Sequence, residues 1–142
     1  MMMPSVKVLE KKIAKFFGAP YAVAVDCCTH GVELCLRYVK ANAVESPHRT
    51  YPSIPFLARK LSLPLIWKDE EWKDYYEVGS SPLFGTKVYD AAVLWKENSY
   101  IPESFMCLSF QFQKHLSLGR GGMILTDDEY AARDLRMMAH DG

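Results

Sequence analysis

One lysine, Lys114, stands between two short apolar runs, and this setting suits covalent chemistry. Residues 105–108 form the run before it, and residues 123–125 form the run after a Gly-Arg-Gly-Gly segment at 119–122. Short apolar runs bounded by glycines are typical of buried strands. An amine held between two strands loses part of its hydration, which favours the neutral form that attacks a carbonyl group. The spacing predicts either a Schiff-base lysine or an ordinary solvated loop lysine.

A second candidate site lies at the turn after residues 21–25. These five residues are apolar and β-prone and predict a buried strand, and apolar residues then recur at helical spacing over 32–39. The first N–H groups of such a helix point at the strand end and, with the helix dipole, can bind an anion. Thr29 adds a hydroxyl to this turn. The alternative is that Thr29 or Asp26 only caps the helix.

A third candidate is Asp90, the last residue of a predicted strand at 87–90. The carboxyl ends of parallel strands form the crevice where open α/β sheets bind their ligands. Asp90 is therefore either a ligand-binding carboxylate or a solvated aspartate at the end of a strand.

The remaining segments alternate between helices and strands. Further helices are predicted from an N-cap at Ser5 to Gly18, over 56–61, and from a capping box at Thr126 to Gly142. Another strand is predicted at 63–67, loops at 41–46 and 79–82, and no regular structure at 68–76. This alternation predicts an α/β fold, a three-layer α/β/α arrangement with a mostly parallel sheet, in one domain that spans residues 1–142.

The composition argues against several classes of protein. The chain has 142 residues, of which 49% are hydrophobic, and its formal net charge is zero. Such a chain folds, and its scattered lysines and arginines predict no nucleic-acid surface. Its apolar stretches are well short of a transmembrane span, so we expect no membrane partner. The cysteines form no CxxC pair, and the histidines are dispersed, so we expect reduced thiols in a cytoplasmic protein and no metal site.

Three separated motifs resemble the DegT/StrS family of sugar aminotransferases, which depend on pyridoxal phosphate (PLP) and have the aspartate-aminotransferase fold. The first is the run 21–25 followed by Thr29, and the second is Tyr-Asp-Ala-Ala at 89–92. The third and most specific is Ser-Phe-xxx-Lys-x-Leu-xx-Gly-x-Gly-Gly at 109–122. The tail from Asp127 continues the likeness. The resemblance implies a truncated large domain of a fold-type I PLP-dependent transferase, with no C-terminal small domain within these 142 residues.

The resemblance also implies a role for each candidate. Lys114 would form the Schiff base with PLP and then shuttle a proton. Asp90 would pair with the pyridine nitrogen, so that the ring acts as an electron sink. Tyr51 would place its ring against the cofactor. The residues expected at the phosphate are Cys28, Thr29 and Ser109.

The implied reaction transfers an amino group from glutamate to a nucleotide-linked keto sugar, in a homodimer. Three positions depart from the family pattern: Cys28 stands where a small residue, usually glycine, is expected, His30 is bulkier than the usual residue after Thr29, and Val93 stands where Gln or His usually faces the cofactor. The section between Leu65 and Val88 is also shorter than in the family. These departures leave open a second function, a catalytically inactive aminotransferase fold that acts as a binding or interaction module. A nucleotide phosphate loop at 119–122 is disfavoured because the segment lacks the Gly-Lys-Ser/Thr ending of a P-loop.

Overall fold

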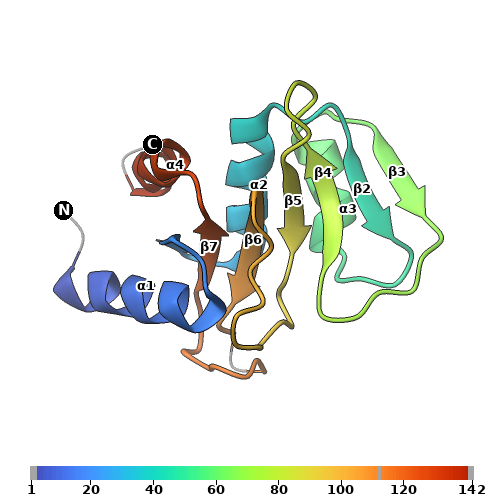
Figure 1. Ribbon diagram of the computed structural model, residues 1–142. Coiled ribbons are helices and arrows are strands. Elements are labelled where there is room, and N and C mark those ends of the chain that lie inside the picture. Colours follow the sequence, from blue (N-terminus) through green and yellow to red (C-terminus); the bar gives the residue numbers. More distant parts are fainter. Residues whose placement is uncertain (1–2, 112, 141–142) are drawn as a thin grey trace.

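The computed structural model describes residues 3–111 and 113–140, in which helices and strands alternate (Figure 1). The elements in chain order are α1 (Pro4–Phe17), β1 (Tyr21–Val25), α2 (Cys28–Val39), β2 (Val44–Pro47), α3 (Ser53–Lys60), β3 (Leu65–Lys68), β4 (Tyr76–Ser80), β5 (Lys87–Asp90), β6 (Ser104–Ser109), β7 (Gly122–Thr126) and α4 (Glu129–His140). The α/β class predicted from the sequence is confirmed. Within the described residues, no helix has the length and apolar character needed to cross a membrane.

The main sheet has the strand order β1-β7-β6-β5-β4, and β2 pairs with β3 in a small separate sheet. Among the described strands of the main sheet, only β5 and β6 pair in parallel, and the other three pairs are antiparallel. The prediction of a mostly parallel sheet is therefore wrong. Antiparallel neighbours can be joined by short connections, whereas parallel ones need a crossover. The tight turn between β4 and β5, closed by a hydrogen bond from Ser81 N–H to Thr86 O, permits only the antiparallel arrangement.

Side chains alternate between the faces of the sheet, so each face has its own hydrophobic core. On one face, Met106 and Leu108 of β6 pack with Phe17 of α1. On the other face, Cys107 of β6 packs beneath α2 and α4, where Leu135 is fully buried. The helices thus form the two outer layers of the predicted α/β/α arrangement (Figure 1).

Several predicted boundaries differ from the structure. β1 and β5 have the predicted bounds, but β2 and β4 occupy segments where loops or no regular structure were predicted. α1 begins at Pro4 after Met3, so Ser5 is not its N-cap. Asp128, and not Thr126, caps α4, because its Oδ1 accepts the N–H groups of residues 130 and 131. α3 begins earlier than predicted, and the predicted helix end at Gly142 lies outside the described residues.

Candidate functional site

A hollow of ≈ 710 Å³ lies where β5 and β6 end and where α2 and β7 begin. Its wall contains all six residues that the sequence analysis proposed for cofactor binding or catalysis. The lining residues are Cys27, Cys28, Thr29, Tyr51, Ser53, Asp90, Ala92, Ser109, Gln111, Gln113, Lys114, Gly119 and Arg120. Residues separated by more than eighty positions in the chain are therefore brought to one place by the fold.

The close approach of β7 to the start of α2 shapes one wall of this hollow. Gly122, the first residue of β7, is buried against the backbone of Cys27 and Cys28. A Cβ added to Gly122 would lie 2.8 Å from backbone atoms of both cysteines and from the carbonyl oxygen of Leu108. Real Cβ atoms do not approach backbone so closely, so only glycine lets the strand begin here. The first turn of α2 is consequently held at the carboxyl end of β6.

The first residues of α2 use their side chains differently from the capping that the sequence suggested. Cys27 is the N-cap, and its Sγ accepts the backbone N–H of His30 at 3.4 Å. Asp26 instead pairs with the imidazole Nδ1 of His30. Thr29 forms a hydroxyl–hydroxyl hydrogen bond of 2.9 Å with Ser53, the first residue of α3. The capping alternative for Thr29 and Asp26 is therefore wrong, and two hydroxyl groups lie beside the start of α2.

Asp90 is buried, with an exposed fraction of 8%, and three neutral groups donate to it. Tyr76 donates its hydroxyl to Oδ2 at 3.0 Å, and Ala92 donates its N–H to Oδ1 at 2.9 Å. The Sγ of Cys28 lies 3.7 Å from Oδ1. Burial raises the pKa of the Asp90 carboxyl, although these hydrogen bonds and the charge of Lys114 oppose the rise. The alternative of a solvated strand-end aspartate is therefore wrong.

The thiol of Cys28 is kept in its neutral, donating form. Burial raises its pKa well above the ordinary value, and the negative charge of Asp90 raises it further. The thiol also lies 3.3 Å from the carbonyl oxygen of Cys107. Cys28 thus lies against the paired residues Asp90 of β5 and Cys107 of β6. Of the other cysteines, Cys35 and Cys107 are fully buried, and within the described residues no cluster of three metal-ligating side chains is found.

Lys114 lies in the loop between β6 and β7, as the two flanking apolar runs predicted. The loop folds back on itself, because Phe110 N–H donates to Gly121 O and Leu118 N–H donates to Phe110 O. Lys114 is half-buried in the wall of the hollow. Its positive charge acts on both Asp90 and Cys28, whose pKa values it lowers against the larger effect of burial. The lysine and the buried carboxylate therefore belong to one electrostatic site.

Two further residues stand at the rim. The side chain of Tyr51 is 72% exposed although it lines the hollow, so its ring is available for contact with a bound molecule. The guanidinium of Arg120 lies 3.8 Å from the carboxylate of Asp26, which also holds His30. Arg120 therefore adds a largely exposed positive charge at the mouth of the hollow.

Two residues beside Asp90 were not predicted as site residues: Tyr76 and its partner Thr50, whose hydroxyl hydrogen-bonds to that of Tyr76. The alternation of apolar Tyr76, charged Glu77 and apolar Val78 was the sequence signal that could have identified β4. Ser53 and Arg120 carried no comparable signal, because their places in the hollow depend on how α3 and the loop after β6 fold.

Comparison with known families identifies the class of protein. The model of the DegT/DnrJ/EryC1/StrS aminotransferase family matches residues 1–59 and 101–142, well over half of the chain. The chain therefore belongs to this family. The comparison with curated proteins gave no match.

Solved structures give the same fold. A Bacillus cereus protein provisionally assigned as a PLP-dependent aminotransferase is 17% identical, with a TM-score of 0.78, over 96% of this chain and 49% of its own. A Streptococcus pneumoniae protein provisionally assigned as a sugar aminotransferase, in its PLP form, is 17% identical, with a TM-score of 0.77, over 96% and 50%. DesI, solved in the presence of its TDP-sugar product, is 18% identical, with a TM-score of 0.72, over 96% and 45%. The chain thus spans about half the length of these proteins.

Proposed function

We propose that this chain is the cofactor-binding core of a PLP-dependent aminotransferase that acts on sugars. The observation that carries the proposal is the setting of Asp90. Its buried carboxylate receives hydrogen bonds from neutral groups, and among the described side chains no cation lies within ion-pair distance of it. Such a carboxylate suits the protonated ring nitrogen of PLP, which would supply the missing positive charge.

The phosphate group of the cofactor would lie at the start of α2. Thr29 and Ser53 present their hydroxyls together there, and Ser109 is half-buried in the same wall. The first backbone N–H groups of a helix and the positive end of its dipole favour a phosphate. Cys28 is the first residue of α2, and its thiol contacts Asp90. It therefore connects the proposed phosphate site with the proposed site of the pyridine ring.

Lys114 would hold the cofactor through its amine and would later carry the proton at the α-carbon of the amino donor. PLP, when bound, serves as the electron sink for the electrons left at that carbon. Tyr51 would cover the ring from the open side of the hollow, which its exposed position allows. Lys114 is half-buried in the wall of the same hollow as Asp90, as this role requires.

Glutamate is the proposed amino donor, and a nucleotide-linked keto sugar is the proposed acceptor. Family membership and the TDP-sugar product of the similar DesI support a sugar acceptor. Arg120, at the mouth of the hollow, suits an anionic group of either substrate. A homodimer and a cytoplasmic location also belong to the proposal, and sedimentation at several protein concentrations would test the dimer.

The proposal is tested by absorption spectroscopy of the purified chain with added PLP, followed by glutamate. We expect a visible band from lysine-bound cofactor that glutamate bleaches, that is absent in Lys114→Ala, and that persists in Lys96→Ala, a control at an exposed lysine outside the hollow. A band that no amino donor bleaches would favour the inactive binding module. The absence of a band in the unmodified chain would refute the proposal.

A further inference from the structure

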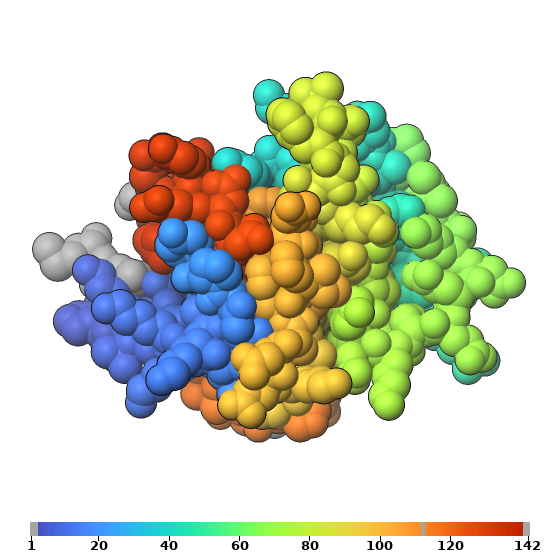
Figure 2. Space-filling model, viewed as in Figure 1, coloured from blue at the N-terminus to red at the C-terminus, as the bar shows by residue number. Residues whose placement is uncertain are grey.

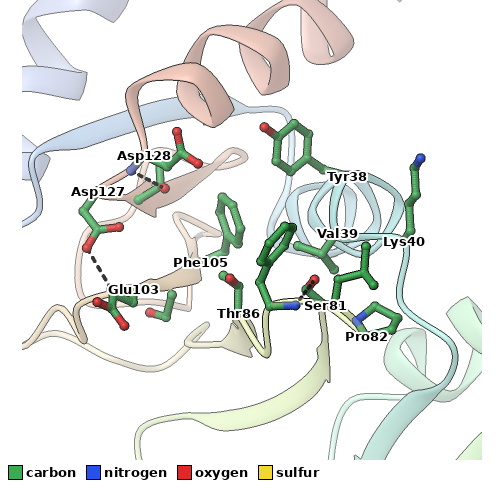
Figure 3. Close-up of a pocket in the computed structure, with 14 residues that line it drawn as sticks. Tyr38, Val39, Lys40, Ser81, Pro82, Thr86, Glu103, Phe105, Asp127 and Asp128 are labelled. Atoms are coloured by element: carbon green, nitrogen blue, oxygen red, sulfur yellow. Dashed lines mark hydrogen bonds between the residues drawn. The ribbon is translucent and has the colours of Figure 1, made fainter.

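A second cavity, of ≈ 530 Å³, is shown in Figure 3. It lies at the opposite ends of β5, β6 and β7 from the proposed cofactor site. It is formed where β5 and β6 begin and where β7 ends, and the end of α2 and the β4–β5 turn complete it. The volume is in the range of cavities that bind small molecules, roughly 300–1,000 Å³. None of the residues proposed for PLP binding lines this second cavity.

Three aromatic rings from three different elements contribute to the second cavity. Tyr38 of α2 and Phe105 of β6 meet edge to face, with ring centroids 5.9 Å apart. Phe105 is buried and supports the half-buried ring of Tyr38, so Tyr38 and Phe84 are the rings that a ligand can reach. Phe84 comes from the β4–β5 turn, and its side chain is 85% exposed. The pKa of Tyr38 is raised by burial and by the charge of Asp128, so its phenol remains neutral.

The exposure of Phe84 is not a consequence of a loose backbone. Its N–H donates to the hydroxyl of Ser81 at 3.2 Å, and Gly85 N–H donates to Ser81 O at 2.9 Å. The neighbouring Leu83 is also exposed, at 86%. Figure 2 shows the yellow-green β4–β5 turn projecting at the top of the molecule. A hydrogen-bonded turn therefore presents two large apolar side chains at the mouth of the cavity, where a ligand could cover them.

Three acidic residues lie together on one side of these rings (Figure 3). Glu103, Asp127 and Asp128 line the cavity, and among the described residues none of the three forms an ion pair. Two of them are fixed: Asp127 accepts Glu103 N–H at 2.8 Å, and Asp128 is held by the first N–H groups of α4. The one cation in the lining is Lys40, and Figure 3 shows its amine directed away from the rings.

We propose that the second cavity binds a small organic cation, an alkyl- or arylammonium group with an apolar body. Aromatic faces attract cations through their ring quadrupoles, and the attraction increases when the cation loses water. The carboxylates add Coulomb attraction and repel anions such as phosphorylated sugars. Leu83 and Phe84 would close over the apolar part of the ligand. The site does not depend on the proposed PLP chemistry.

The test compares choline with 3,3-dimethylbutan-1-ol, a neutral molecule of nearly the same shape, in amide NMR titrations of the ¹⁵N-labelled chain. We expect choline to shift the signals of Thr86 and Phe105, and the neutral alcohol to bind at least about tenfold more weakly, because it lacks the cation–π and Coulomb terms. Equal binding of the two molecules, or the absence of shifts with choline, would overturn the proposal.

Two variants locate the binding. Phe84→Leu keeps an apolar side chain on an exposed turn and should weaken choline binding by roughly three- to tenfold. Asp128→Asn removes charge but retains an N-cap residue, so it should weaken binding without unfolding α4. Phe56→Leu is the matched control, an exposed phenylalanine on α3 outside the cavity, and should leave binding unchanged. Unchanged binding in both Phe84→Leu and Asp128→Asn would contradict this location of the site.

Discussion

Replacing Tyr76 with phenylalanine should destabilise the protein in a pH-dependent way. The Tyr76 side chain is almost fully buried, and its hydroxyl donates to the Asp90 carboxylate at 3.0 Å. The substitution removes that donor and retains the ring, which packs against Trp72 with the ring centroids 4.8 Å apart. It therefore removes the hydrogen bonds of the hydroxyl, to Asp90 and to Thr50, and leaves the ring packing of the strand in place; of the two partners, only Asp90 titrates between pH 3 and pH 8.

The magnitude follows from the kind of acceptor. A hydrogen bond to a charged group contributes about 1.5–3 kcal/mol, against about 1 kcal/mol for a neutral pair. With an unfolding entropy of about 2.1 cal/mol/K per residue, a loss of about 2 kcal/mol lowers the Tm of this chain by about 7 °C. The Tyr76 hydroxyl lowers the pKa of Asp90, so its removal should raise that pKa further. The destabilisation should therefore be largest above the pKa of Asp90 and should shrink as the carboxyl is protonated.

Urea unfolding of the unmodified chain and of Tyr76→Phe, from pH 3 to pH 8, measures this effect. The matched control is Tyr100→Phe, because Tyr100 is also buried but donates to a neutral acceptor, the carbonyl oxygen of Ser104, at 2.7 Å. The control should lose about 1 kcal/mol at every pH. A pH-independent loss in Tyr76→Phe, equal to that of the control, would refute the view that Tyr76 stabilises a charged Asp90.

Two other predictions concern the same wall of the hollow. Asp90→Asn should raise the unfolding free energy at neutral pH and abolish PLP binding. Burial raises the pKa of Asp90 in the folded chain above its ordinary value of 3.8. The unfolding free energy of the unmodified chain should therefore fall as pH rises from 3.8 through that raised pKa. Urea unfolding should show that Asp90→Asn lacks this dependence on pH. Gly122→Ala should cost about 3 kcal/mol, because its Cβ would meet backbone atoms. By contrast, Gly85→Ala should cost only about 1–2 kcal/mol, because the added Cβ would meet no atom within 4 Å and the only cost is the positive φ of this residue. Similar Tm values for the two variants would contradict the view that β7 needs glycine at position 122.

The strands that the sequence predicted well are those with continuous apolar residues. β1, β6 and β7 are buried on both faces, so their sequences show the apolar runs that this position requires. β2 has no such run: it is buried through Ser46 and Pro47, residues that usually indicate a loop. Its burial is imposed by α3 and by its pairing with β3, which the local sequence does not reveal.

β4 was missed for a different reason. Gly79 suggested a loop, but the structure shows that it serves packing, because a Cβ there would lie 2.6 Å from a methyl carbon of Leu36 on α2. The strand directions were also beyond reach, since they depend on connection lengths and pairing rather than on apolar patterns. Helix–sheet contact and strand order therefore determine the parts of the fold that local patterns cannot predict.

The candidate site was predictable where a residue of a reactive type stands next to a recognisable strand. This holds for Lys114, Asp90 and Thr29, so their placement at the same ends of the strands could be anticipated. The network around them could not, because Tyr76 reaches Asp90 across antiparallel strands, and Ser53 reaches Thr29 between two helices. Such partners are chosen by tertiary packing and leave no spacing in the sequence.

The most direct test of the proposed function is to locate the covalent attachment of PLP. The purified chain is incubated with PLP, reduced with borohydride, digested and mapped by mass spectrometry. We predict a single stoichiometric pyridoxyl adduct on Lys114, with the exposed lysines, such as Lys96, left unmodified. An adduct distributed over exposed lysines, or concentrated on a lysine outside the hollow, would contradict the assignment of this site.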